Sequence, residues 1–71
     1  MPKLPHLSGA EIIRALEHLG FVRTRQKGSH VIMRRGESGC VVPLHREVKT
    51  GTLAGLLRQA GVTPEEFVKI L

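Results

Sequence analysis

Residues 27–35 read Lys-Gly-Ser-His-Val-Ile-Met-Arg-Arg, a glycine turn that runs directly into a short and mostly apolar segment. Glycine adopts the positive backbone φ angles that tight hairpin turns require, and the segment after it has the length and composition of a β-strand. The turn therefore predicts a hairpin in which His30 lies at the start of the second strand. The segments on both sides of this hairpin carry further signals.

A helix and a strand are predicted before the hairpin. Ser8 and Glu11 have the spacing of a capping box, in which each side chain bonds the other residue's backbone amide at a helix start. Apolar residues then recur at helical intervals between residues 12 and 19, and Gly20 supplies a left-handed stop. Residues 21–26 alternate in part between apolar and polar, which is typical of a strand.

A second turn, a third strand and two helices are predicted after the hairpin. Residues 36–39 form the turn and residues 40–45 the strand, in which Pro43 cannot donate to a ladder and so indicates a sheet edge. Thr50 is placed to cap a helix with an apolar stripe that ends at Gly61. Residues 63–66 form another capping box, with proline at the first helical position, before a short helix whose apolar residues are Phe67, Ile70 and Leu71.

The resulting order is α-β-β-β-α with a short C-terminal helix. It predicts an α+β fold, a three-stranded antiparallel sheet with helices on one face. With 71 residues, we expect one domain spanning residues 1–71. No apolar run approaches the roughly 18 residues of a membrane span, so we expect a cytoplasmic protein with no membrane partner.

The charge of the chain narrows the class of partner. Eleven Lys and Arg residues against six acidic residues give a formal charge of +5. On so small a body this favours a polyanion such as nucleic acid, or an acidic protein, although surface charge that only aids solubility would look the same.

The hairpin registers that the glycines suggest place His30 in a basic patch. They pair residue 25 with residue 30 on one side, and residues 35 with 40 and 30 with 45 on the other. Val22 and Thr24 then lie on the apolar side of the sheet with Val31 and Met33. The open face carries five basic or imidazole side chains: Arg23, Arg25, His30, Arg34 and His45.

Such a patch suits the cleavage of a phosphodiester. An imidazole can take the proton from a ribose 2′-hydroxyl, and an imidazolium can protonate the leaving oxygen. Guanidinium groups bind phosphate in forked geometry and stabilise the charge of the transition state. The acidic residues are all Glu, so the aspartates that commonly hold catalytic Mg²⁺ are absent, and we expect neither a metal nor another cofactor.

Other interpretations of these residues stay open or fail. His30 can be only a packing residue at a strand end. Cys40 and His45 point to opposite faces of one strand and make a poor zinc pair, and the adjacent Ser29 and His30 diverge too strongly for a serine dyad. Lys27-Gly28-Ser29 precedes a strand rather than a helix, which argues against a nucleotide-binding loop.

Several motifs in order along the chain resemble the HicA toxin family, also called YcfA-like proteins. The matching segments are Leu19-Gly20-Phe21, Lys27-Gly28-Ser29-His30, Val42-Pro43-Leu44-His45, residues 49–53, Gln59-Ala60-Gly61 and Glu65-Glu66-Phe67. They cover nearly the whole chain. Unlike many relatives, this chain has no aromatic residue after the histidine.

The resemblance implies a fold like the double-stranded-RNA-binding domain and a specific activity. Members of the family are small ribonucleases that cut messenger RNA, and a HicB antitoxin neutralises them. The catalytic histidine of the family corresponds to His30, the glycine and serine of its motif to Gly28 and Ser29, and a second matched histidine to His45.

The predicted function is therefore a metal-independent endoribonuclease toxin of a type II toxin–antitoxin pair. His30 is the acid/base residue, with His45 as a possible second catalytic residue. Phosphate contacts are expected from Arg23, Arg25, Lys27 and Arg34. The expected partners are messenger RNA and a HicB-like antitoxin, with no small-molecule cofactor. The alternatives are a non-catalytic double-stranded-RNA-binding module and a protein-interaction module that uses the same face.

Overall fold

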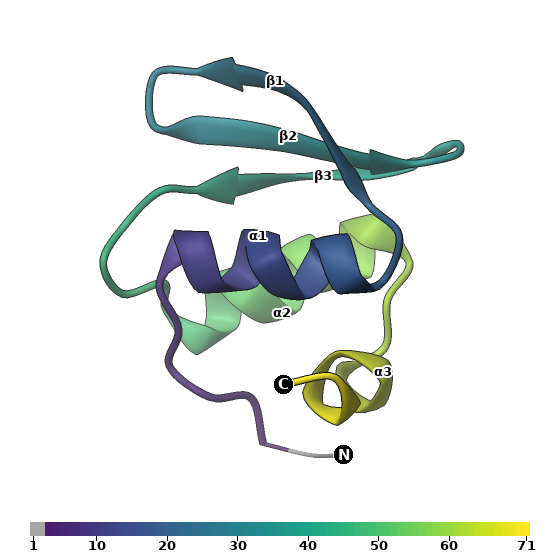
Figure 1. Ribbon diagram of the computed structural model, residues 1–71. Helices are drawn as coiled ribbons and strands as arrows, with labels where there is room; N and C mark the ends of the chain where they lie inside the picture. The colour runs from purple at the N-terminus through teal and green to yellow at the C-terminus, as the bar shows by residue number, and fades with distance from the viewer. Residues whose placement is uncertain (1–2) are drawn as a thin grey trace.

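The computed structural model describes residues 3–71 and has the predicted order of elements (Figure 1). The elements are α1 (Gly9–His18), β1 (Val22–Lys27), β2 (His30–Arg35), β3 (Ser38–Pro43), α2 (Thr50–Ala60) and α3 (Pro64–Lys69). The three strands form one antiparallel sheet in the order β1-β2-β3. The α+β class, the α-β-β-β-α pattern and the edge position of β3 are thus confirmed.

The helix starts follow the predicted capping in two of three cases. Ser8 caps α1 in a reciprocal capping box with Glu11, and Thr63 caps α3 in the same way with Glu66. The prediction for α2 was wrong, because Thr50 is its first helical residue and Lys49 occupies the cap position without a side-chain hydrogen bond.

Both hairpins are tighter than predicted. Residues 28 and 29 form a two-residue turn that pairs Lys27 with His30, and residues 36 and 37 form another that pairs Arg35 with Ser38. The predicted registers were therefore wrong by two residues in each hairpin. A slip of two leaves every β2 and β3 side chain on its predicted face, since side chains alternate with a period of two.

A β-bulge at Thr24 changes the faces of β1. The register shifts between Arg23 and Arg25, and the Thr24 Oγ1 hydroxyl donates to the Ile32 carbonyl oxygen over 3.2 Å. Beyond the bulge Val22 pairs with Arg34 and is 60% exposed. The prediction that Val22 and Thr24 enter the core was wrong, because the extra residue reverses the alternation upstream of it.

The core lies between the helix-facing side of the sheet and the helices. Figure 1 shows α1 and α2 together on the side of β3, while β1 is the strand farthest from them. Fully or nearly fully buried side chains come from β2 and β3 (Val31, Met33, Cys40, Val42), from all three helices, and from Phe21. Phe67 of α3 is also buried, whereas Leu71, which follows the end of the helix, is 55% exposed. None of the helices within residues 3–71 has the length and apolar character needed to span a membrane.

Candidate functional site

His30 is the first residue of β2 and is exposed between two other strands. It pairs with Lys27 of β1 across the turn and with Pro43 of β3 on its other side. A two-residue turn fixes this position, because Gly28 takes a φ of +59° that residues with a side chain rarely adopt. The turn thus places His30 directly between a lysine and a proline in the sheet.

His30 and Pro43 form the closer of the two kinds of residue pair that occur in an antiparallel ladder. In an antiparallel ladder, hydrogen-bonded and non-hydrogen-bonded pairs alternate, and side chains approach most closely in the second kind. The Leu44 amide donates to the Ser29 carbonyl oxygen over 2.7 Å, so the neighbouring pair of His30 and Pro43 is non-hydrogen-bonded. Proline is tolerated here because its missing N–H would point away from β2.

The N-terminus of α1 holds this end of β3 in place. The Gly9 amide donates to the His45 carbonyl oxygen over 2.9 Å. A Cβ at Gly9 would collide with the Pro43 carbonyl oxygen and lie 2.9 Å from the Leu44 Cα. Only glycine allows the helix to approach so closely, and the strand end opposite His30 is fixed by this contact.

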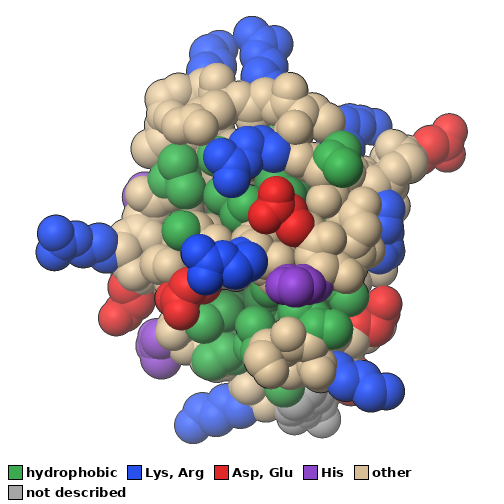
Figure 2. Space-filling model, viewed as in Figure 1, with side chains coloured by type: hydrophobic (Ala, Val, Ile, Leu, Met, Phe, Trp, Pro, Cys, Tyr) green, Lys and Arg blue, Asp and Glu red, His purple; other side chains and the backbone are tan. Residues whose placement is uncertain are grey.

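The open face of the sheet, the side away from the helices, consists of three cross-strand rows. Each row contains one residue from β1, β2 and β3 in turn: Lys27, His30 and Pro43; then Arg25, Ile32 and Val41; then Val22, Arg34 and Gly39. Residues 22–43 hold five Lys and Arg residues against one acidic residue, Glu37 in a turn. Figure 2 shows basic side chains projecting at the top of the molecule, where β1 lies in Figure 1.

This face contains most of the predicted basic patch, but two members lie elsewhere. Arg25, His30 and Arg34 share the open face as predicted, although Lys27 rather than Arg25 is opposite His30. Arg23 pairs with Met33 and lies on the other face because of the bulge. His45 follows the end of β3, exposed and two residues beyond Pro43, so the predicted direct pairing with His30 was wrong.

Gly28 and Ser29 form the turn beside His30, and both are exposed. The Gln26 Nε2 amide donates to the Gly28 carbonyl oxygen over 3.1 Å, which ties the turn to β1. Sequence reasoning missed Pro43 as the direct neighbour of His30. The pair Gly28-Ser29 carried the needed signal, because glycine followed by a small polar residue is typical of a two-residue hairpin turn.

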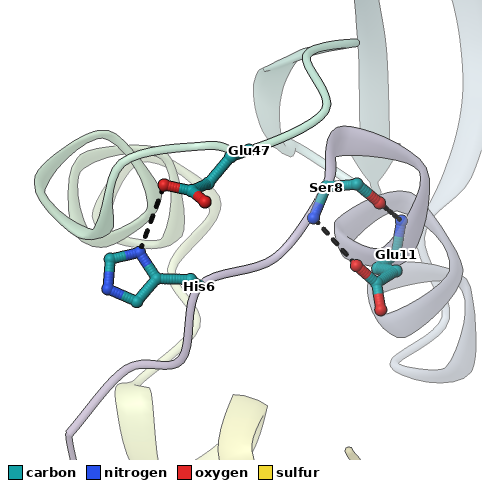
Figure 3. Close-up of polar contacts among 4 residues, drawn as sticks. All are labelled: His6, Ser8, Glu11 and Glu47. Atoms are coloured by element: carbon teal, nitrogen blue, oxygen red, sulfur yellow. Dashed lines mark hydrogen bonds and ion pairs between the residues drawn. The ribbon is translucent and has the colours of Figure 1, made fainter.

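The other histidines do not join this site. His18 is exposed on α1. The His6 Nδ1 atom lies 3.7 Å from Glu47 Oε1 (Figure 3), and both side chains are largely exposed, so this contact is a weak surface pair. The same view shows the Ser8 and Glu11 capping box at the start of α1, beside this pair.

Neither a thiol nor a metal cluster adds chemistry to the open face. Cys40 is 4% exposed on the core side of β3, and burial raises its pKa to about 11, which keeps the thiol protonated and unreactive. Among residues 3–71, no three His, Cys or Glu side chains are grouped closely enough to hold a metal ion. The functional groups of the face are thus one imidazole, three cationic side chains and several aliphatic side chains.

The comparison with protein families gives a match that covers most of the chain. A family model described as the HicA toxin of bacterial toxin–antitoxin systems matches residues 9–62, which include α1, the whole sheet and α2. A search of curated proteins found no match to the chain.

Proposed function

This chain belongs to the HicA toxin family, and from that premise we propose that it is an endoribonuclease that cleaves messenger RNA without a metal ion, with His30 as its acid/base residue. Membership makes it the toxin of a bacterial toxin–antitoxin pair. We further propose that a HicB-like protein is the antitoxin, that the toxin acts in the cytoplasm, and that residues 1–71 form one toxin domain.

The observation that carries the catalytic proposal is the position of His30. Its imidazole is exposed at the end of the open face, paired with Lys27 and in the row next to Arg25. A phosphodiester bound to these cations would lie within reach of the imidazole. Cationic side chains fixed where negative charge develops in the transition state lower the barrier of phosphoryl transfer. They stabilise this charge in place of a metal ion.

The reaction that fits these groups is transesterification within the RNA, in which the 2′-hydroxyl attacks the neighbouring phosphorus. The neutral His30 imidazole accepts the 2′-hydroxyl proton while the 2′-oxygen forms a bond to phosphorus, and the bond from phosphorus to the 5′-oxygen breaks. The products are a 2′,3′-cyclic phosphate and a 5′-hydroxyl. An acid must supply the proton to the leaving 5′-oxygen, and His45, as an imidazolium, is the candidate for that role.

Lys27, Arg25 and Arg34 are proposed to hold phosphates of the strand, and the Gly28-Ser29 turn to lie against its backbone. Arg23 is no longer proposed as a main phosphate contact. It pairs with Met33, on the side of the sheet away from the open face. The contact between Gly9 and the end of β3 serves the same site indirectly, since it fixes the strand that flanks His30.

The experiment that tests this function is cleavage of a defined RNA in the presence of EDTA, with analysis of the product ends. We expect cleavage with 2′,3′-cyclic phosphate and 5′-hydroxyl ends, and resistance of the same RNA when a 2′-deoxynucleotide replaces the one at the cut. Cleavage that requires a divalent metal, or that gives 3′-hydroxyl ends, would overturn the mechanism. Binding of RNA without cleavage would favour the non-catalytic double-stranded-RNA-binding module.

A further inference from the structure

The middle row of the open face places two adjacent aliphatic side chains, Ile32 and Val41, between the basic residues of the rows on either side. Ile32 of β2 is half-buried, and its β3 neighbour Val41 is 42% exposed. The row ends at Arg25 of β1, and the row with His30 lies about 7 Å away along the strands. Both phenylalanines of the chain are buried in the core, and the chain has no Tyr or Trp, so the only aromatic ring on this face is the imidazole of His30.

An RNA duplex leaves this apolar row without a partner. A double helix presents phosphates and 2′-hydroxyls to a protein surface and keeps its base faces stacked inside. A single strand, in contrast, can turn a base out so that its face packs against apolar or guanidinium groups. Internal 2′-transfer also needs the 2′-oxygen in line with the leaving oxygen, a geometry that a flexible single strand reaches more easily than a duplex.

We propose that the open face binds single-stranded RNA along β2, with the base next to the cleaved phosphate packed on Ile32 and Val41 beside the Arg25 guanidinium. This proposal rests on the proposed ribonuclease function and names its substrate class. The phosphate at the cut lies at Lys27 and His30, and the next part of the strand reaches Arg34. The Arg34 side chain lies across Gly39, where a Cβ would be 3.4 Å from the Arg34 Cγ, so it extends over β3.

The charges of the face favour RNA as the occupant over a protein. Lys27, Arg25 and Arg34 surround the apolar row on one face, and the single acidic residue between residues 22 and 43 lies in the β2–β3 turn. The row is also continuous with the row that holds His30. A surface of this kind matches a chain that alternates phosphates with apolar base faces.

The test measures RNA binding by fluorescence anisotropy, with the full chain carrying His30→Ala so that, on the proposed mechanism, the oligonucleotide stays intact. We expect Val41→Ser to weaken binding of a single-stranded oligonucleotide by about fivefold, a loss of roughly 1 kcal/mol. Its slope of log affinity against log salt should not change, because no phosphate contact is lost. Arg25→Ala should lower that slope by about 0.7, the value for one phosphate contact of a single strand.

A gain of affinity separates base packing from a merely structural role. Val41→Phe places an aromatic ring opposite Ile32 at a strand position that accepts it, and should tighten single-strand binding severalfold. Leu71→Ser, at an apolar residue that is 55% exposed and lies outside the sheet, is the matched control and should leave RNA affinity unchanged. Circular dichroism should show the same fold for all variants.

Each outcome bears on one proposal or on both. Unchanged single-strand affinity in Val41→Ser and Val41→Phe, with RNA cleavage by the parent protein, would overturn the base-packing proposal and leave the ribonuclease function intact. Tighter binding to a duplex than to a single strand would also overturn it. Loss of antitoxin binding alone in Val41→Ser would assign the row to the protein partner. No RNA binding and no cleavage by the parent would reject both proposals.

Discussion

Arg34 and Arg35 are adjacent in β2 but lie on opposite faces of the sheet. Arg34 pairs with Gly39 on the open face. Arg35 Nη1 donates to the Leu19 carbonyl oxygen over 2.8 Å, and its guanidinium carbon lies 4.6 Å from the centroid of the Phe21 ring. Of two neighbouring arginines, one is therefore free to bind a ligand while the other joins the sheet to the end of α1.

Because of this difference, we expect substitution by alanine to lower stability at Arg35 and to weaken RNA binding at Arg34. Arg35→Ala should lower the free energy of unfolding by about 1–2 kcal/mol, because a part-buried hydrogen bond and a cation–π contact are both lost. Arg34→Ala should leave stability nearly unchanged and weaken RNA binding instead. Urea denaturation and RNA titration of both variants check this, and equal losses of stability would show that the faces are assigned wrongly.

Gly9→Ala should damage the fold near the proposed site. The added methyl group would collide with backbone atoms of Pro43 and Leu44, which cannot move without disturbing β3, and we expect a loss of about 2–4 kcal/mol in the free energy of unfolding. Gly51→Ala is the matched control, because nothing lies within 4 Å of its Cβ position in α2. That variant should be neutral or more stable by about 0.5 kcal/mol. Similar stabilities for the two variants would contradict the close contact.

Cys40 predicts a loss of stability in alkali. Its pKa in the fold is raised to about 11 from the usual 9.0 by burial, so the unfolded chain releases this proton at a lower pH than the folded chain. The contribution of Cys40 to stability should thus be constant below pH 9.0 and fall as the pH rises towards about 11. Urea denaturation across this window checks it, and Cys40→Ala should show a shallower decline. Rapid reaction of the native thiol with a disulfide reagent at neutral pH would argue against its burial.

Glu11 predicts a loss of stability in acid. Hydrogen bonds from the Ser8 backbone and side chain lower the pKa of its carboxyl below the usual 4.5. A lowered pKa stabilises the fold above the unfolded value of 4.5, and this contribution disappears as the pH falls through the folded value. Glu11→Gln should remove this acid dependence, whereas Ser8→Ala, which keeps the backbone amide that donates to the carboxylate, should only reduce it. Thermal unfolding monitored by circular dichroism at neutral and acidic pH is the measurement, and an unchanged acid dependence in Glu11→Gln would exclude this carboxyl group as its source.

The sequence predicted the elements of this fold because their signals are local. The capping box of Ser8 and Glu11, the apolar periodicity of α1 and the glycine stop at Gly61 each depend on residues within a few positions of one another. The face on which His30, Ile32 and Arg34 lie was also predictable, because alternation along a strand survives a slip of two residues.

The predictions that failed concern features that are set by contacts between residues far apart in the sequence. The bulge at Thr24 arises from pairing with β2 and has no glycine to mark it, so the change of face at Arg23 and Val22 could not be predicted from alternation. The close approach of Gly9 to the end of β3 joins residues more than thirty positions apart. Only the hairpin registers could have been improved, from the two-residue turns that begin at Gly28 and Gly36.

The most direct test of the central claim compares RNA cleavage by the parent protein, His30→Ala and His18→Ala in EDTA. His18 is an exposed histidine on α1 outside the open face, so its removal controls for the loss of an imidazole elsewhere. We predict cleavage by the parent and by His18→Ala, and a rate at least about 100-fold lower for a folded His30→Ala that still binds RNA. Cleavage by His30→Ala at the parental rate would contradict the assignment of His30 as the acid/base residue.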